Sequence, residues 1–391
     1  MANTLTGLIP TLYESLDIVS RELIGIIPAA NADHNIDRAA KGQTVMSFAT
    51  PAVTASDIVP GVTAPNDGDQ VIANVPITIS KSRYVPIRWN GEEQRGVNSG
   101  GPGALRIMRD QFAQGFRTLC NEVEVDLALA ARLAASRAVG TAGTTPFGTN
   151  GDLSDFALAR QVLEDNGAPT SDLHYIAGSS AMANIRGKQA VLFRVNEAGT
   201  DQLLREGVVG RVEGMNLHNS AAIKSAAIAK GTGAAYTSNA AGYAIGATAI
   251  TLITGTGTVL AGDIVTFAGD ANKYVVAAGV AAPGVITLAA PGLRQAIPAA
   301  ATALTVGNAF VPNLAFSRNA LVLATRLPAV PVDASGNAMD MADDRITIID
   351  PFSGLAFEVS LYTQYRQIKY EIGLAWGQSA VKPEHIALGL G

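Results

Sequence analysis

"ALRIMRDQFAQGFRTLCNEVEVDLALAARLAASRA", residues 104–138, is the strongest helical pattern in the chain. Its apolar side chains recur at intervals of three and four residues, which places them on one face of an α-helix. They are Leu105, Met108, Phe112, Phe116, Leu119, Val123, Leu127, Ala130 and Ala134. Pro102 lies near the start, where proline is favoured, and Gly115 is the only weak helix former. The stretch predicts one helix about 50 Å long, far beyond the mean length.

Two different patterns precede this helix. Residues 11–27, "TLYESLDIVSRELIGII", have the spacing of an amphipathic helix that Pro28 ends. We expect this helix to pack on its own core or to contact a neighbouring subunit or helical partner. Residues 41–95 contain short β-prone runs separated by proline and by the turn "APNDGDQ". They predict a long two-stranded excursion, which needs more sheet or another chain to lie on.

The segments after the helix alternate between α and β patterns and then become strongly β-rich. Residues 153–169 predict a helix that ends at Gly167, "LHYIAGS" a strand, and "SAMANIRGKQAVLF" another helix. Between 231 and 317 the composition shifts to Ala, Gly and Thr, and the runs "AITLI", "DIVTFAG", "KYVVAAG", "GVITLAA" and "ALTVG" predict a small inserted β-barrel. The C-terminal part then predicts a strand at "NALVLATRLP", a hairpin at "RITIIDPFSGLAFEVSLYTQY" and further strands at "QIKYEIGLAWGQSAVKP".

Composition excludes several classes of protein. A net charge of −5 argues against a protein that binds nucleic acid through a basic stripe. Cys120 is the only cysteine, so we expect no internal disulfide and no cysteine cluster for zinc, in keeping with a reducing cytoplasm. The N-terminus lacks the pattern of a signal peptide. Residues 231–262 carry no charge but are interrupted by Gly, Thr, Ser and Asn, so we expect no membrane span.

No stretch carries the pattern of a reactive site. "TGTGTVLAGDIVTFAG" (254–269) lacks the lysine of a phosphate-binding loop and the spacing of a dinucleotide loop. "IAGSSAMAN" lacks the second glycine of a hydrolase elbow, and the four histidines are far apart in sequence. Asp333, Ser335, Asn337 and Asp344 have calcium-loop spacing, but Ala338 replaces the turn glycine, so a solvated hairpin tip is the preferred interpretation. We therefore predict no enzyme, no catalytic residue, no metal and no cofactor.

The order of these elements resembles the major capsid proteins of tailed bacteriophages with the Hong Kong ninety-seven fold. More narrowly, it resembles the P-twenty-two-like coat proteins, which carry an insertion domain. The final stretch "EIGLAWGQSAVKPEHIALGLG" (371–391) is similar to that family's closing strand and terminus. "GDIVTFAG" (262–269) and "VEGMNLHNSAAI" (212–223) resemble the insertion domain and the strand that enters it, 104–138 the spine helix and 41–95 the extended loop.

The resemblance implies an α+β fold with a long spine helix, an extended β-hairpin loop, an axial α/β domain and an inserted small β-barrel. The regions mapped by position are 1–40, the N-terminal arm; 41–95, the extended loop; 96–150, the peripheral domain with the spine helix; 151–224, the first part of the axial domain; 225–309, the insertion domain; and 310–391, the rest of the axial domain with the peripheral strands.

The resemblance also implies function and partners. Hexamers and pentamers of the chain would close into an icosahedral phage head around double-stranded DNA, by way of a scaffold-assisted procapsid that expands on maturation. Scaffolding protein and portal are expected partners, DNA is contacted non-specifically, and binding of a decoration protein is left open. The chain would assemble in the bacterial host cytoplasm and reside in the virion. Closed shells need large, mostly non-ionic interfaces, which agrees with the 16% of charged residues.

The candidate contact residues are regional. Glu14, Asp17 and Glu22 on the arm are candidates to bind a basic scaffold helix or another subunit. Lys81, Arg83 and Arg88 on the loop are candidates to pair across subunits. Ordinary solvated charge is the alternative for both groups. Some members of the wider fold cross-link a loop lysine to an asparagine, but no pattern here identifies the partner of a lysine such as Lys81.

Two other classes remain as alternatives. An encapsulin-like compartment shell of the same fold would hold cargo enzymes rather than DNA, and the insertion and the coat-type terminus argue against it. A β-rich surface or adhesion protein would need an export signal, which the chain lacks. A hydrolase is disfavoured because no base lies near any candidate nucleophile.

Overall fold

The computed structural model describes residues 25–49, 53, 55–63, 68–69, 72–98, 104–189, 210–224, 226–333, 339–350 and 354–391. Its main helix, α3 (Ala104–Ala134), confirms the helix expected from the sequence, although it ends four residues earlier. The chain leaves the helix there because Ser136 donates its backbone N–H and its hydroxyl to the Ile386 carbonyl, and Arg137–Gly140 forms strand β5. Hydrogen bonding to a distant segment therefore overrides local helical preference.

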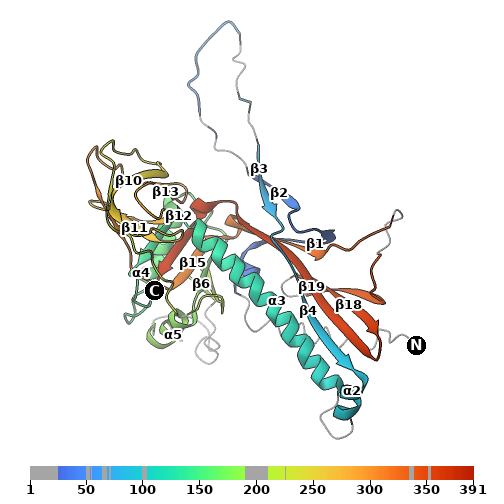
Figure 1. Ribbon diagram of the computed structural model, residues 1–391. Coiled ribbons are helices and arrows are strands. Elements are labelled where there is room, and N and C mark those ends of the chain that lie inside the picture. Colours follow the sequence, from blue (N-terminus) through green and yellow to red (C-terminus); the bar gives the residue numbers. More distant parts are fainter. Residues whose placement is uncertain are drawn as a thin grey trace, which may run out of the picture.

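The long helix lies against a six-stranded sheet (Figure 1). Its central strand is β19 (Gln367–Ala380), which pairs with β4 (Lys81–Asn90) on one side and with β18 (Ala356–Gln364) and β16 (Leu321–Pro328) on the other. β17 (Asp344–Ile349) and β1 (Asn31–Ala39) complete the sheet, and β1 pairs with β16 in parallel. The expected hairpin between β17 and β18 is confirmed.

Aromatic side chains hold the helix on the sheet. The ring of Phe112 meets Tyr370 edge-on at 5.3 Å between centroids, and Phe116 meets Phe357 at 5.2 Å. These rings belong to the largest apolar core of the described chain, which also contains Trp376. Helix α2 (Gly91–Asn98) connects β4 to this helix. The part of the apolar stripe that contains Phe112 and Phe116 thus packs on this sheet.

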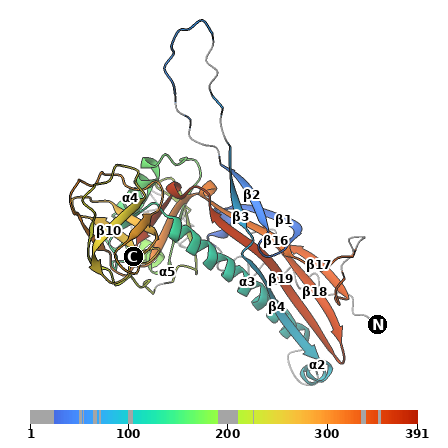
Figure 2. The same ribbon diagram turned by 45° about the horizontal axis from the view of Figure 1, so that its top comes forward.

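A two-stranded sheet projects from this body (Figures 1 and 2). It consists of β2 (Thr44–Ala49) and β3 (Ala73–Thr78), which pair antiparallel in the register Thr44 with Thr78. The expected two-stranded excursion is therefore present. The sequence grouped residues 81–90 with this loop, but they form β4 and pair with β19 along their whole length, as part of the body of the fold.

A second sheet contains the other strands of the described chain and closes partly on itself. Six strands pair in a ring, so the inserted barrel is observed as a closed structure with its own apolar core. In ring order the strands are β9 (Ala234–Ser238), β10 (Ala249–Thr256), β13 (Val285–Leu288), β12 (Lys273–Ala278), β11 (Ile264–Phe267) and β14 (Ala303–Val306).

The remaining strands of this sheet form a mixed α and β layer beside the barrel. The sheet continues from β12 through β5 (Arg137–Gly140), β20 (Ile386–Leu390), β15 (Pro312–Ser317), β6 (Leu173–Ala177), β8 (Met215–Asn219) and β7 (Arg211–Val212). Helices α4 (Ser154–Asp165) and α5 (Ser179–Lys188) accompany it, together with the short 3-10 helices η2 (Ile27–Ala29), η4 (Arg318–Ala320) and η5 (Pro383–His385). The described chain is therefore a mixed α and β fold, and none of its helices has both the length and the hydropathy of a membrane span.

Candidate functional site

The base of the projecting hairpin is fixed in the body by apolar contacts and by one close backbone approach. Ile77 and Ile79 are fully buried in a small core with Val322 and Ala375. A Cβ added to Gly377 of β19 would lie 2.1 Å from the Thr78 carbonyl oxygen, so only glycine lets these two backbones meet. The hairpin thus leaves the body in a fixed direction.

An ion pair and a buried indole strengthen the same base. Lys81 Nζ lies 2.8 Å from Asp126 Oδ1 of α3, and Trp376 Nε1 donates to Asp126 Oδ2 at 2.9 Å. Lys81 also lies over the Trp376 ring, 5.8 Å from its centroid. Asp126 therefore connects the long helix, the central strand and the residue that follows the hairpin.

The structure places the three candidate loop residues on β4 and not on the projecting hairpin. Lys81 contacts Asp126, and Arg83 Nε lies 3.2 Å from Glu122 Oε2 of α3. Arg88 is exposed and makes no ion pair with the part of the chain that the structure describes. Two of the three side chains thus have partners inside the subunit, and pairing with another subunit stays a prediction.

The far end of the hairpin exposes apolar side chains. Ile58, Val59 and Val62 have exposed fractions of 96%, 79% and 106%. Burying one such side chain would contribute about 1.5–3 kcal/mol relative to leaving it in water. These side chains are therefore available to contact another molecule.

An uncharged groove lies where the C-terminal half of α3 meets the barrel and the end of β19. Its volume is about 420 Å³. It is lined by Ala130, Leu133, Ala134, Ala277, Leu288, Ala289, Ala290, Gln378, Ser379, Ala380 and Pro383. Val125 and Leu129, each almost half exposed, extend its apolar surface along the helix because they precede Leu133 by eight and four residues. The helix therefore has an apolar outer stripe towards its C-terminus.

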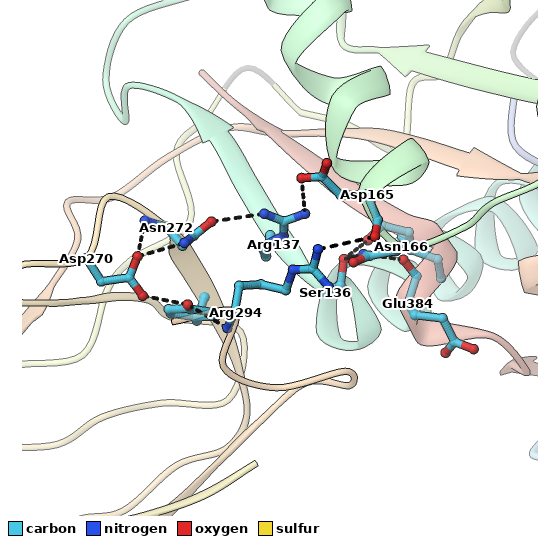
Figure 3. A network of polar contacts seen from close by, with 10 residues as sticks. Ser136, Arg137, Asp165, Asn166, Asp270, Asn272, Arg294 and Glu384 are labelled. Atoms are coloured by element: carbon cyan, nitrogen blue, oxygen red, sulfur yellow. Dashed lines mark hydrogen bonds and ion pairs between the residues drawn. The ribbon is translucent and has the colours of Figure 1, made fainter. Parts of the chain in front are cut away.

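A polar network connects the barrel to β5 and α4 (Figure 3). Arg137 of β5 is almost buried, and its guanidinium donates to Asn272 Oδ1 of the barrel and to Asp165 Oδ2 of α4, both at 2.9 Å. Arg294 of the barrel donates to the Asp165 carbonyl oxygen at 3.3 Å. Two arginines from different segments thus meet at Asp165.

The barrel side of this network is organised by Asp270. Its carboxylate accepts hydrogen bonds from Asn272 Nδ2 at 2.7 Å and from the Tyr274 hydroxyl at 2.6 Å. Burial and Asp270 raise the pKa of Tyr274 to about 12, so this hydroxyl stays protonated and remains a donor. β12 also pairs directly with β5 through Tyr274 and Arg137. The barrel is therefore attached by both backbone and side-chain contacts.

Two histidines that are far apart in sequence lie together on neighbouring strands. His174 Nδ1 and His218 Nε2 are 3.0 Å apart on the parallel strands β6 and β8. Asp172 accepts from His174 Nε2 at 2.9 Å, so His174 Nδ1 is the acceptor and His218 the donor. Burial is the main reason that the pKa of His174 is lowered and that of His218 falls to about 4. Sequence spacing gave no signal of this pair, because only strand pairing brings it together.

Other candidate groups are structural or lie elsewhere. Cys120 is buried, and burial raises the pKa of its thiol, which is the opposite of what a nucleophile needs. His34 Nδ1 lies 2.7 Å from Thr325 Oγ1, a hydroxyl of a completely buried residue on β16. Within the described ranges no three His, Cys, Asp or Glu side chains form a group that could hold a metal.

The candidate scaffold-contact residues fall outside the described residues. Glu14, Asp17 and Glu22 belong to the first 24 residues, and so does most of the helix expected over 11–27. Ser335 and Asn337 of the loop with calcium spacing also lie outside them. The proposed contacts of these residues therefore stay predictions.

The chain is similar to known proteins in structure but not in sequence. No protein-family model matches the chain, and no curated protein matches it. The solved structures that are similar to it include capsids and a virus-like particle. The capsid of the cyanophage P-SCSP1u is 12% identical, with 91% of this chain and 86% of that chain covered and a TM-score of 0.47.

Two further structures are similar over most of their length. The mature capsid of bacteriophage PhiM1 is 11% identical, with 93% of this chain and 85% of that chain covered and a TM-score of 0.45. The virus-like particle from Pyrococcus furiosus is 9% identical, with 97% and 98% covered and a TM-score of 0.44.

Proposed function

We propose that the chain is a major capsid protein of a tailed phage, with the Hong Kong ninety-seven fold and an inserted barrel. The observation that carries the proposal is the projecting hairpin, whose base is rigidly held while its far end exposes Ile58, Val59 and Val62. A monomeric protein gains nothing from such a loop, whereas a subunit of a shell buries it on a neighbour. The long helix and the extended loop are the elements that the family resemblance requires.

The uncharged groove beside α3 supports a head-to-tail arrangement of subunits. It differs from the hairpin tip, so contact between the two would be heterologous, and contacts of this type generate closed rings where the rotation between subunits closes. Figures 1 and 2 show the hairpin projecting away from the body, so its tip is available to a second copy. We propose that such contacts build hexamers and pentamers.

The finer parts of the proposal follow the resemblance. We propose the division into arm (1–40), extended loop (41–95, of which residues 81–90 form β4 in the body), peripheral (96–150), axial (151–224 and 310–391) and insertion (225–309) regions. Scaffolding protein and portal are proposed partners, with Glu14, Asp17 and Glu22 as scaffold contacts. Arg88 is the best of the three loop candidates for pairing with another subunit, because Lys81 and Arg83 already have partners on α3. Packaged double-stranded DNA would be contacted non-specifically and no catalysis is proposed.

Electron microscopy of the expressed chain, with and without the scaffolding protein of its phage, tests the proposal. Uniform closed shells are expected, and a stable monomer under all conditions would overturn it. Shells that retain enzymes as cargo and never package DNA would favour the encapsulin-like alternative.

Matched variants locate the contact. Val62→Asp in the hairpin tip and Leu129→Glu on the exposed apolar stripe beside the groove should each abolish shells while the soluble chain stays folded. Gln114→Glu, on the polar and exposed part of the same helix, should assemble like the wild type. Unchanged assembly of both interface variants would contradict the proposed head-to-tail contact.

A further inference from the structure

Glu124 is a carboxylate buried inside the subunit, on α3, with 2% of the residue exposed. Burying a carboxylate is costly unless donors surround it. Burial accordingly raises the pKa of Glu124, while hydrogen bonds from Ser220, Ile27, Ile26 and Gly25 oppose that rise. The residue is almost completely shielded from solvent, and it belongs to neither the groove nor the hairpin.

Its hydrogen bonds connect three separate parts of the chain. Glu124 Oε1 accepts from the backbone N–H groups of Ile26, at 2.9 Å, and Ile27, at 3.1 Å. Oε2 accepts from the Ser220 hydroxyl at 2.7 Å. Ser220 follows β8 directly, so one carboxylate joins the long helix, the start of η2 and the end of an axial strand.

The segment held in this way follows directly after the first 24 residues in the sequence. Ile26 and Ile27 are 0% and 1% exposed. A Cβ on Gly25 would lie 2.4 Å from the Asn219 carbonyl oxygen, so the chain passes Asn219 in close backbone contact. Position and direction at Gly25 are therefore fixed from two sides.

We propose that Glu124 is a positioning residue that fixes the exit of the N-terminal arm and couples it to both the long helix and the axial sheet. An apolar residue of the same size would fill the space but would leave two amide donors and one hydroxyl donor without an acceptor. The carboxylate offers two acceptor oxygens and satisfies all three donors at once. This role rests on the proposed function only where it concerns assembly.

Amide hydrogen exchange on the unassembled chain tests the positioning role. Glu124→Ala should speed exchange at Ile26 and Ile27 by at least about tenfold, while the amides of Val123 and Leu127 in α3 change much less. A merely stabilising role would speed exchange at both places alike, and this result would overturn the proposal. Glu122→Ala is the matched control, because Glu122 lies on the same helix and its ion pair with Arg83 is more exposed.

Two further variants keep the test decisive if Glu124→Ala does not fold. Glu124→Gln should restore slow exchange, because its Oε1 can accept from both amides and its Nε2 can donate to the Ser220 hydroxyl. Ser220→Ala removes one connection and should speed exchange at Ile26 and Ile27 severalfold. Wild-type exchange in Ser220→Ala, or fast exchange in Glu124→Gln, would overturn the coupling.

Assembly gives the second measurement. Glu124→Ala should form malformed or open particles under conditions in which Glu122→Ala forms uniform shells, and Glu124→Gln should restore them. Uniform shells from Glu124→Ala would show that arm position does not depend on this residue. If the wild type forms no shells at all, the proposed function fails, whereas the exchange results on the soluble chain still decide the role of Glu124.

Discussion

Trp376 Nε1 donates a hydrogen bond of 2.9 Å to Asp126 Oδ2, although 250 residues separate the two in sequence. Trp376 is completely buried and Asp126 nearly so. Because the other oxygen of Asp126 contacts Lys81, this single carboxylate connects β19 and the residue after the hairpin to α3. The direction of the projecting hairpin thus depends on a buried polar contact.

Asp126→Ala should lower the free energy of unfolding by about 1–3 kcal/mol, because the buried indole N–H of Trp376 loses its acceptor. Urea denaturation measures the loss. Glu122→Ala, which breaks the more exposed pair with Arg83, should cost no more than about 1 kcal/mol. Equal losses in the two variants would show that the Trp376 contact contributes nothing particular.

Gly377→Ala should destabilise the hairpin base by about 1–3 kcal/mol or more, because the new Cβ would lie 2.1 Å from the Thr78 carbonyl oxygen. Limited proteolysis within residues 44–78 and urea denaturation detect the change. Gly187→Ala in α5 meets nothing within 4 Å and should be neutral or slightly stabilising. A tolerated alanine at 377 would mean that β3 and β19 can separate without cost.

Arg137→Ala should loosen the barrel from α4, since the nearly buried guanidinium joins Asn272 to Asp165. We expect the free energy of unfolding to fall by about 1–3 kcal/mol and amide exchange in β5 and β12 to become faster. Lys382→Ala removes a more exposed pair with Glu384 and should change neither quantity measurably. Unchanged exchange in Arg137→Ala would indicate that backbone pairing of β5 with β12 suffices.

Acidification should destabilise the fold through His218. Its pKa lies at about 4 in the fold against an ordinary 6.5, so between these values the unfolded chain binds a proton that the folded chain does not. Stability therefore falls as pH decreases from about 6.5 towards 4, by at most about 1.4 kcal/mol per pH unit and less where solvent screens the ring. Thermal unfolding of His218→Gln should show a flatter slope between pH 6.5 and 5, and an unchanged slope would assign the effect to other groups.

The sequence alone predicted the local elements well. The apolar spacing of 104–134 gave α3, the glycine- and proline-bounded runs of 249–306 gave five barrel strands, and Arg345–Ile348 gave one strand of the β17–β18 hairpin. These signals are local because side-chain periodicity and turn chemistry act over a few residues. β9 was missed because "AAYTS" is short and follows a glycine-rich stretch.

Tertiary structure decided which segments meet. Residues 81–90 have the β pattern of the neighbouring loop, yet ten register pairs with β19 place them in the body. Ser136 and Arg137 continue a helical pattern but bond to β20 and α4. The contacts of Glu124 with Ile26, and of His174 with His218, span 98 and 44 residues.

The sequence therefore determined an α and β chain with one very long helix, an extended loop and a β-rich insertion, because each element is encoded by its own periodicity. Only the tertiary structure decided which residues hold these parts to the body. Asp126 holds the base of the hairpin, Glu124 holds the segment at Ile26 and Ile27, and Arg137 holds the barrel. The partner of a polar side chain is defined only when folding brings donor and acceptor to within about 3 Å of each other, and no local sequence pattern encodes that contact.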